Sequence, residues 1–193
     1  MLTFNPRTYT RIPLALFSFP APLPLDGGEP NAAVQGSLEA LADSREFNDG
    51  VTDKDMARCC LAGLWQAHNF LEPSHELSQA VHTSTGSYWH AVLHRREGDY
   101  ENSKYWFRAV GREHPIFGQL YREAKALAET DAERARAAEF LASQPQWNPA
   151  AFVDACAAAV RGTAVFGGLI RRVAHFEWEA LFDHSYRAAF NGR

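Results

Sequence analysis

After residue 30, apolar residues recur at helical spacing through most of the chain, and no stretch of useful length alternates between apolar and polar residues. A half-buried strand needs that alternation, because successive side chains of a strand point to opposite faces. The pattern therefore predicts an all-α fold of about seven or eight helices. The chain has 193 residues, which is enough to bury one core, so we expect residues 31–193 to form a single-domain helical bundle.

Prolines, glycines and capping residues set the bounds of the expected helices. Pro73 predicts the end of one helix and the first turn of the next, and Gly98-Asp99 predicts a tight turn. Pro145 and Pro149 bracket a further break. The helices are expected at about residues 31–42, 52–71, 74–81, 87–97, 100–110, 118–143, 149–161 and 169–190.

The first 30 residues differ from the rest because they contain six of the ten prolines. Proline lacks a backbone donor and fixes φ, which disfavours both a helix and a central strand. Leucine and phenylalanine residues are interspersed among these prolines. We therefore expect residues 1–30 to form an extended arm that packs across the helical body. The six prolines are Pro6, Pro13, Pro20, Pro22, Pro24 and Pro30.

Composition excludes several classes of partner. The 19 basic and 23 acidic residues give a net charge of −4, and no polybasic run is present, so nucleic acid is not expected as a partner. No stretch reaches the roughly 18 apolar residues needed to cross a bilayer, so no membrane partner is expected either. The three cysteines are an odd number without a Cys-x-x-Cys pair, which favours a reducing compartment and a cytoplasmic protein. No feature specifies an oligomeric state.

Residues 86–117 resemble one unit of the tetratricopeptide family, which is a helical hairpin of about 34 residues. Small side chains at a helix crossing let two backbones approach closely, and this segment has them where the repeat does. The resemblance implies a hairpin of two helices. No second copy follows at that period, whereas a solenoid needs about three. The matching residues are the turn Gly98-Asp99-Tyr100, the small residues Ala91 and Ser103, the large residue Phe107 and the terminal Pro115.

The same segment also resembles an uncharacterised family of all-helical proteins. The pattern is Tyr-Trp-His-x3-His-Arg-Arg-Glu-x-Asp-Tyr, which here runs from Tyr88 to Tyr100 and is followed by Tyr105-Trp106-Phe107-Arg108. The resemblance implies a helical fold and no particular activity.

Histidines concentrate in the centre of the chain, where six of the eight lie between His68 and His114. His90 and His94 are four residues apart on an expected helix, so their imidazoles share one face. They also occupy two positions where a tetratricopeptide unit has large apolar residues. A histidine pair at this spacing is how helices present two nitrogens to one metal ion.

A catalytic zinc or iron ion needs a third ligand and an open coordination position. His75, on the expected preceding helix, is the first choice for that ligand. The sequence therefore predicts a divalent metal site, holding zinc or iron, at His75, His90 and His94. Substitutes for the third ligand are Glu72, Glu97 and His184.

Two alternatives need no metal. His90 and His94 can be buried core residues that are hydrogen-bonded to Glu97, Asp99 or the backbone. His94 can also form an acid–base couple with Glu97 or Asp99, because a carboxylate orients a histidine as a base.

Residues around the histidines complete the predicted site. Glu97 is expected to act as a base or to orient a ligand from behind, and Arg95 or Arg96 to clamp an anionic oxygen. The alternative for the arginines is a solvated helix end, which the helix dipole favours. Aromatic residues can wall a pocket for a small molecule, although core packing explains them as well. The expected pocket comprises Tyr88, Trp89, Asp99 and His184.

Together these features predict a small enzyme with a metal-assisted site that acts on a small polar or anionic molecule. The sequence contains no Gly-x-Ser-x-Gly nucleophile motif and no phosphate-binding glycine loop, which disfavours nucleotide-dependent chemistry. One alternative is a non-catalytic helical scaffold that binds a peptide or a partner protein. Another is a protein that carries or senses a metal without turnover.

Overall fold

Helices account for all the regular structure of residues 4–130, 144–164 and 166–190, which are the residues that the computed structural model describes. Nine α-helices and three short 3-10 helices lie in these ranges, and no strand is present among them. The prediction of an all-α, single-domain helical bundle is therefore confirmed.

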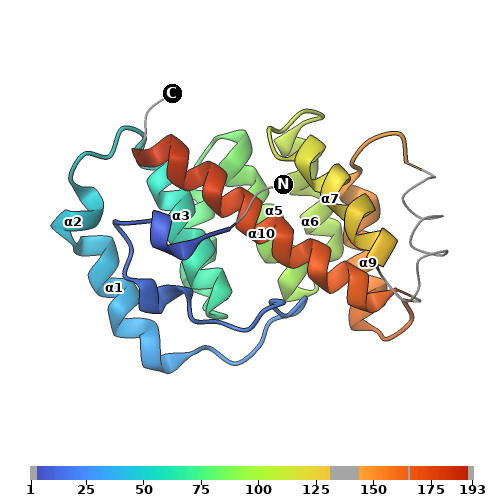
Figure 1. The fold of residues 1–193 in the computed structure, drawn as a ribbon, viewed down its shortest axis with the longest axis horizontal. Helices are drawn as coiled ribbons and strands as arrows, with labels where there is room; N and C mark the ends of the chain where they lie inside the picture. The colour runs from blue at the N-terminus through green and yellow to red at the C-terminus, as the bar shows by residue number, and fades with distance from the viewer. Residues whose placement is uncertain (1–3, 131–143, 165, 191–193) are drawn as a thin grey trace.

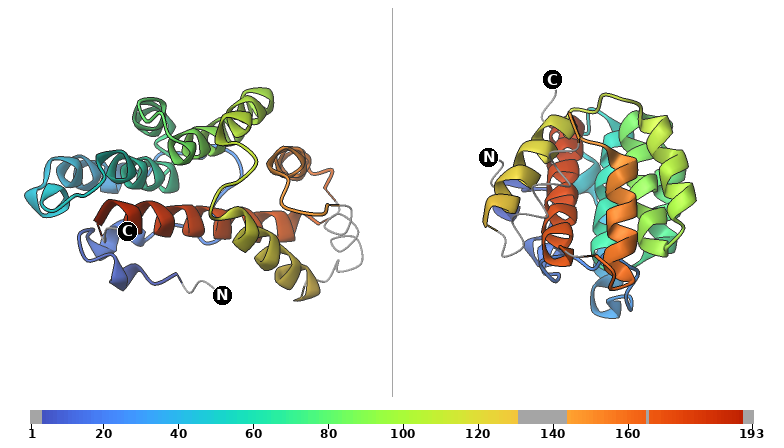
Figure 2. Two further views of the ribbon diagram at one scale, coloured as in Figure 1. Left: turned by 90° about the horizontal axis from the view of Figure 1, so that it is seen from above. Right: turned by 90° about the vertical axis from the view of Figure 1, so that its right-hand side faces the viewer.

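The long helix α10 (Gly167–Phe190) crosses the middle of the molecule (Figure 1). It packs against α3 (Lys54–Ala67) on one side and contacts α7 (Phe117–Thr130) and α9 (Pro149–Val160) elsewhere. Figure 2 shows α10 and α7 on one side of the molecule, with the row of α3, α5 and α6 on the other. The remaining helices are α1 (Gln35–Asp43), α2 (Arg45–Asn48), α4 (Leu71–Gln79), α5 (Ser84–Glu97) and α6 (Tyr100–Val110).

Helices α5 and α6 form the predicted central hairpin. The bounds of α6 agree with the sequence prediction, because Gly98 adopts a left-handed conformation (φ 81°) and Asp99 accepts a hydrogen bond from the backbone N–H of Asn102. At the crossing, the Ser103 hydroxyl donates to the carbonyl of Ala91 (2.7 Å), so the helices approach closely there. The likeness of this hairpin to a tetratricopeptide unit stays a prediction.

The boundary between α3 and α4 differs from the sequence prediction. Helix α3 ends at Ala67 rather than near residue 71, because Asn69 takes a positive φ of 63° that a helix does not allow. Helix α4 then begins at Leu71 and contains Pro73 in its first turn, where a missing N–H costs nothing. His75 lies within α4, as it does in the helix expected at residues 74–81. The helix predicted for 118–143 is described as far as Thr130, and its remainder lies outside the described residues.

The N-terminal arm covers one face of α10. It contains the short helices η1 (Pro6–Thr8) and η2 (Leu14–Phe17), so it is less extended than the prolines suggested. The ring of Tyr9 lies 5.2 Å from that of Phe182 on α10, and the Tyr9 hydroxyl donates to Asp183 (3.1 Å). Five apolar side chains of the arm are buried, namely Tyr9, Ile12, Leu16, Leu23 and Leu25.

The connection between α4 and α5 packs tightly against one glycine in the first turn of α5. A Cβ atom at Gly86 would lie 2.2 Å from the carbonyl oxygen of Val81, which is far inside van der Waals contact. Only glycine therefore permits this packing of the first turn of α5 against the residues that follow α4. This tight connection joins α4 to α5, the two helices that carry the three histidines of the site described below.

Helix α10 spans 24 residues, but its sequence contains charged residues, including Arg171, Arg172 and Glu177. Within the described ranges, no helix combines the length and the apolar character that crossing a bilayer requires.

Candidate metal centre

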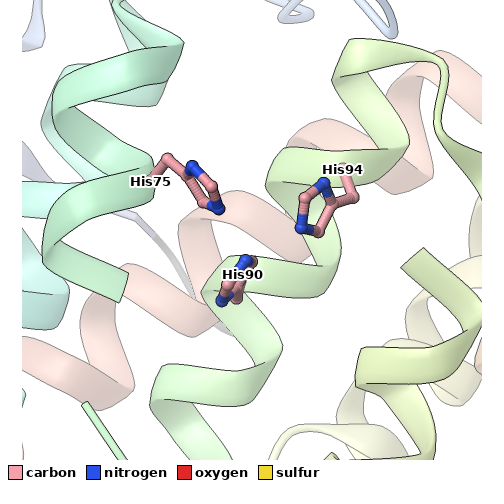
Figure 3. Close-up of side chains that lie close together, drawn as sticks. All are labelled: His75, His90 and His94. Carbon is pink, nitrogen blue, oxygen red and sulfur yellow. The ribbon is translucent and has the colours of Figure 1, made fainter. Parts of the chain in front are cut away.

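Three histidines from two helices converge between α4 and α5. Figure 3 shows His75 on α4 facing His90 and His94 on α5. Each offers one ligand nitrogen, and these three atoms lie within 4.8 Å of one another. The ring centroid of His75 is 4.7 Å from that of His90 and 5.3 Å from that of His94. The structure thus brings together the three residues that the sequence singled out as ligands.

Helix α6 also contacts the cluster. The ring of Trp106 stacks on that of His90, with the centroids 4.1 Å apart and the planes inclined by 17°. One turn earlier on α6, the side-chain amide of Asn102 contacts His94. His75 is half-buried, so the cluster reaches the protein surface at this residue.

His90 is the most confined of the three. Its residue exposure is 1%, and neither ring nitrogen has a hydrogen-bond partner. Burial lowers the pKa of His90 to about 3, and the neighbouring His94 and His75 add to the effect. The ring therefore stays neutral at physiological pH and keeps one lone pair, which is the state that a metal ion binds.

His94 is held at both nitrogens. Its Nδ1 lies 2.9 Å from Oε2 of Glu97, and its Nε2 lies 3.1 Å from Nδ2 of Asn102. A carboxylate accepts and an amide nitrogen donates, so Nδ1 carries the hydrogen and Nε2 the lone pair. Metal-binding histidines are commonly oriented in this way by a carboxylate on the outer N–H. Glu97 therefore lies where the sequence placed an orienting residue.

The donor set fits zinc or ferrous iron. Tetrahedral ligands at about 2.0–2.1 Å from an ion lie about 3.4 Å apart. The three nitrogens lie within 4.8 Å of one another, so binding an ion would bring them closer by up to about 1.4 Å. Imidazole suits both metals, and three protein ligands leave a fourth position open.

Arg95 does not face the cluster, which corrects the prediction that it lies there as a substrate clamp. Its guanidinium pairs with the carboxylate of Glu177 on α10 and lies 5.1 Å from the ring centroid of Phe152. Both charged side chains are buried, and Tyr88 donates to the second oxygen of Glu177 (2.8 Å). Burial lowers the pKa of Arg95, but the Glu177 carboxylate outweighs burial and holds it above its usual value.

Arg96 points away from the cluster as well. It donates to the backbone carbonyl of Gln66 and to the side chain of Asn69 at the end of α3. Each residue of a helix is rotated by about 100° from the last, so the two positions after His94 leave its face. The alternative prediction of a solvated helix end is also wrong, because both arginines are buried.

The structure places the predicted pocket residues away from the three histidines. Tyr88 and Trp89 are fully buried, and the indole of Trp89 donates to Ser185 on α10 (3.1 Å). Asp99 is exposed and caps α6. Core packing and helix capping therefore account for these three residues.

His184, the remaining predicted pocket residue, belongs to a second pair of histidines. Its ring lies 5.2 Å from that of His114, and the Thr85 hydroxyl contacts Nε2 of each (3.4 and 3.3 Å). Burial, followed by the charge of His184, lowers the pKa of His114 to about 3.

Sequence reasoning did not assign Trp106 or Asn102 to the site. The hairpin itself could have indicated both residues. When two helices run antiparallel, residues at equal distances from the turn face each other. His90 and Trp106 are such a pair, as are His94 and Asn102. A known turn position would therefore have placed both residues against the histidines.

Comparison of the chain with protein families, curated proteins and solved structures gives no significant match. A fold does not by itself imply an activity, so the function has to be argued from the geometry of the site.

Replacing Arg95 tests its structural role. Arg95→Met leaves the Glu177 carboxylate buried without its partner, which we expect to lower the free energy of unfolding by about 3–5 kcal/mol. The control is Arg58→Met, since Arg58 pairs with Asp55 at the surface (3.0 Å), where a loss of about 0–1 kcal/mol is expected. Urea unfolding measures both. Equal losses would contradict the buried pairing.

The burial of His90 predicts a change in how stability depends on pH. Between pH about 3 and 6.5 the unfolded chain binds a proton at this residue and the folded chain does not. His90 thus lowers stability as the pH falls through that window and has no such effect above it. In metal-free protein, we expect His90→Phe to reduce the loss of unfolding free energy between about pH 7 and 5. The control His82→Phe, at an exposed histidine, should keep the original slope; a slope unchanged by His90→Phe would contradict the burial.

Proposed function

We propose that this protein binds one divalent transition-metal ion, zinc or iron, through His75, His90 and His94, and that the ion acts on a small polar molecule. The observation that carries the proposal is the convergence of three imidazole nitrogens within 4.8 Å, together with the absence of any hydrogen-bond partner for the buried ring of His90.

The unpartnered ring of His90 is the strongest support. Leaving a buried polar group without a hydrogen bond costs about 1–3 kcal/mol, so such groups are uncommon in folded proteins. A metal ion bound to the lone pair of His90 would remove that cost at one nitrogen. The two other imidazoles beside this ring are the ligands that zinc and ferrous iron accept.

The second support is the carboxylate behind His94. Glu97 accepts the Nδ1 hydrogen of His94 and so fixes the orientation of that ring. Because Glu97 is occupied in this way, we assign it the orienting role and not that of a base.

The small number of protein ligands favours catalysis over a closed structural site. Structural zinc sites use four protein ligands, whereas catalytic sites use three and keep one position open. A metal with an open position supplies a Lewis acid and lowers the pKa of a bound water molecule. A small polar molecule would have to reach that position past His75, which is the half-buried member of the cluster.

A metal-carrying or sensing role is the second candidate. The observation that favours it is the placement of Arg95 and Arg96, whose guanidinium groups are used to hold α10 and the end of α3. Neither is then available to clamp an anionic substrate at the cluster, and a carrier needs no such clamp.

Metal analysis of protein purified without a histidine tag tests the proposal. We expect one zinc or iron ion per chain, and loss of the ion in a His90→Ala/His94→Ala variant. Glu97→Gln is expected to weaken zinc binding by about 10- to 100-fold, because it removes the carboxylate that orients His94. His82→Ala, at an exposed histidine, should retain the ion. Equal metal content in the double variant and the His82 control, with circular dichroism unchanged, would overturn the proposed site.

Cobalt substitution separates the two candidates. Co²⁺ in a site with three imidazoles and an open position absorbs visible light, and its spectrum changes when an anion enters that position. We expect azide to change the spectrum of the cobalt-loaded protein if the site is catalytic. A spectrum that azide leaves unchanged, on protein that holds one Co²⁺ per chain, would favour the carrier.

A further inference from the structure

We propose that Asn102 regulates the metal centre by covering the lone pair of His94, so that an ion binds only when the amide moves away. We name this contact the Asn102 latch. The proposal rests on the function proposed above, and it concerns a residue outside the three ligands.

The latch follows from the hydrogen bonds of His94. Its Nδ1 hydrogen is donated to Glu97, which leaves Nε2 as the only nitrogen of this ring with a lone pair. Nδ2 of Asn102 lies 3.1 Å from that nitrogen and donates to it. The nitrogen that would bind a metal is therefore already an acceptor within the protein.

An ion and the Asn102 amide cannot share that lone pair. A metal bonded to Nε2 would lie about 2.0–2.1 Å from it, along the direction in which the amide nitrogen now lies at 3.1 Å. The ion and the amide nitrogen would then be separated by about 1 Å, which is sterically impossible. Metal binding through His94 thus requires the Asn102 side chain to turn away.

The position of Asn102 permits that turn. The residue lies in the first turn of α6 and its side chain is only partly buried. Its backbone N–H is held independently, by the carboxylate of Asp99 (3.3 Å). The side chain can therefore leave His94 without breaking the cap of the helix.

The latch gives the site two properties. In the metal-free protein it satisfies the lone pair of His94 and holds the ring in the orientation that binding needs. It also competes with every ion, by the net strength of one hydrogen bond, so it raises the dissociation constant by about 2- to 10-fold. The factor is the same for every ion that binds through Nε2 of His94.

Zinc titration against a chromophoric chelator measures the effect. We expect Asn102→Ala and Asn102→Leu, neither of which can donate to His94, to bind zinc about 2- to 10-fold more tightly than the original protein. Two variants are used because either substitution can disturb the first turn of α6. Glu101→Ala, which changes the exposed neighbour of Asn102, is the control and should leave the affinity unchanged.

Imidazole ¹⁵N spectra of the metal-free protein give a second readout. Removing a hydrogen bond to a lone pair moves the resonance of that nitrogen to higher frequency. We expect Asn102→Ala to shift Nε2 of His94 in this direction and to leave its Nδ1 resonance in place. An unmoved Nε2 resonance would overturn the latch, whatever the zinc affinity.

The outcomes separate the two proposals. If the original protein and the Asn102 variants bind zinc equally, or the variants bind more weakly, the latch is wrong and the metal function stands. Zinc binding by the variants alone would support the latch and overturn the metal function of the unmodified chain. If neither binds zinc, both proposals are overturned.

Discussion

Burial of α5 on all of its faces is the constraint on which the structure depends. Twelve of its 14 residues are buried, although the helix carries two histidines and two arginines. A buried polar group is stable only when it has a partner, so each face of α5 requires a particular neighbour. Arg95 pairs with Glu177 on α10, and Arg96 reaches the end of α3. The face that carries His90 differs, because neither nitrogen of its ring has a partner, whereas each arginine leaves only one nitrogen unpaired.

This difference gives the metal proposal its physical basis. Each arginine of α5 donates to an acceptor on another part of the chain, although Nη1 of Arg95 and Nε of Arg96 have no partner. On the histidine face the surrounding structure instead brings a third imidazole from α4 and a stacked indole from α6. Neither supplies a hydrogen bond to His90, whereas together they hold its ring beside two other ring nitrogens. A cation that binds neutral imidazoles would give His90 a partner, as the Glu177 carboxylate gives one to Arg95.

The sequence predicted those parts of the fold that depend only on residues close together in the chain. Gly98 and Asp99 fix the turn between α5 and α6 by backbone conformation and capping, so the bounds of α6 could be read from the sequence. The spacing of His90 and His94 fixes their shared face for the same reason. The end of α3 could not be predicted from the sequence. It depends on the left-handed backbone conformation of Asn69, which the residue type alone does not require. The roles of Arg95 and Arg96 were missed because the partner of Arg95 lies 82 residues away, and two adjacent cations at a helix end are usually solvated.

The most direct test of the account is the position of the ion itself. Crystals of zinc-loaded, tag-free protein, measured on both sides of the zinc absorption edge, locate zinc by anomalous diffraction. The account predicts one strong peak about 2.0–2.1 Å from a ring nitrogen of each of His75, His90 and His94, with the Asn102 amide turned away from His94. Zinc bound only at other residues, with the three imidazoles in their present positions and Asn102 still on Nε2, would contradict it.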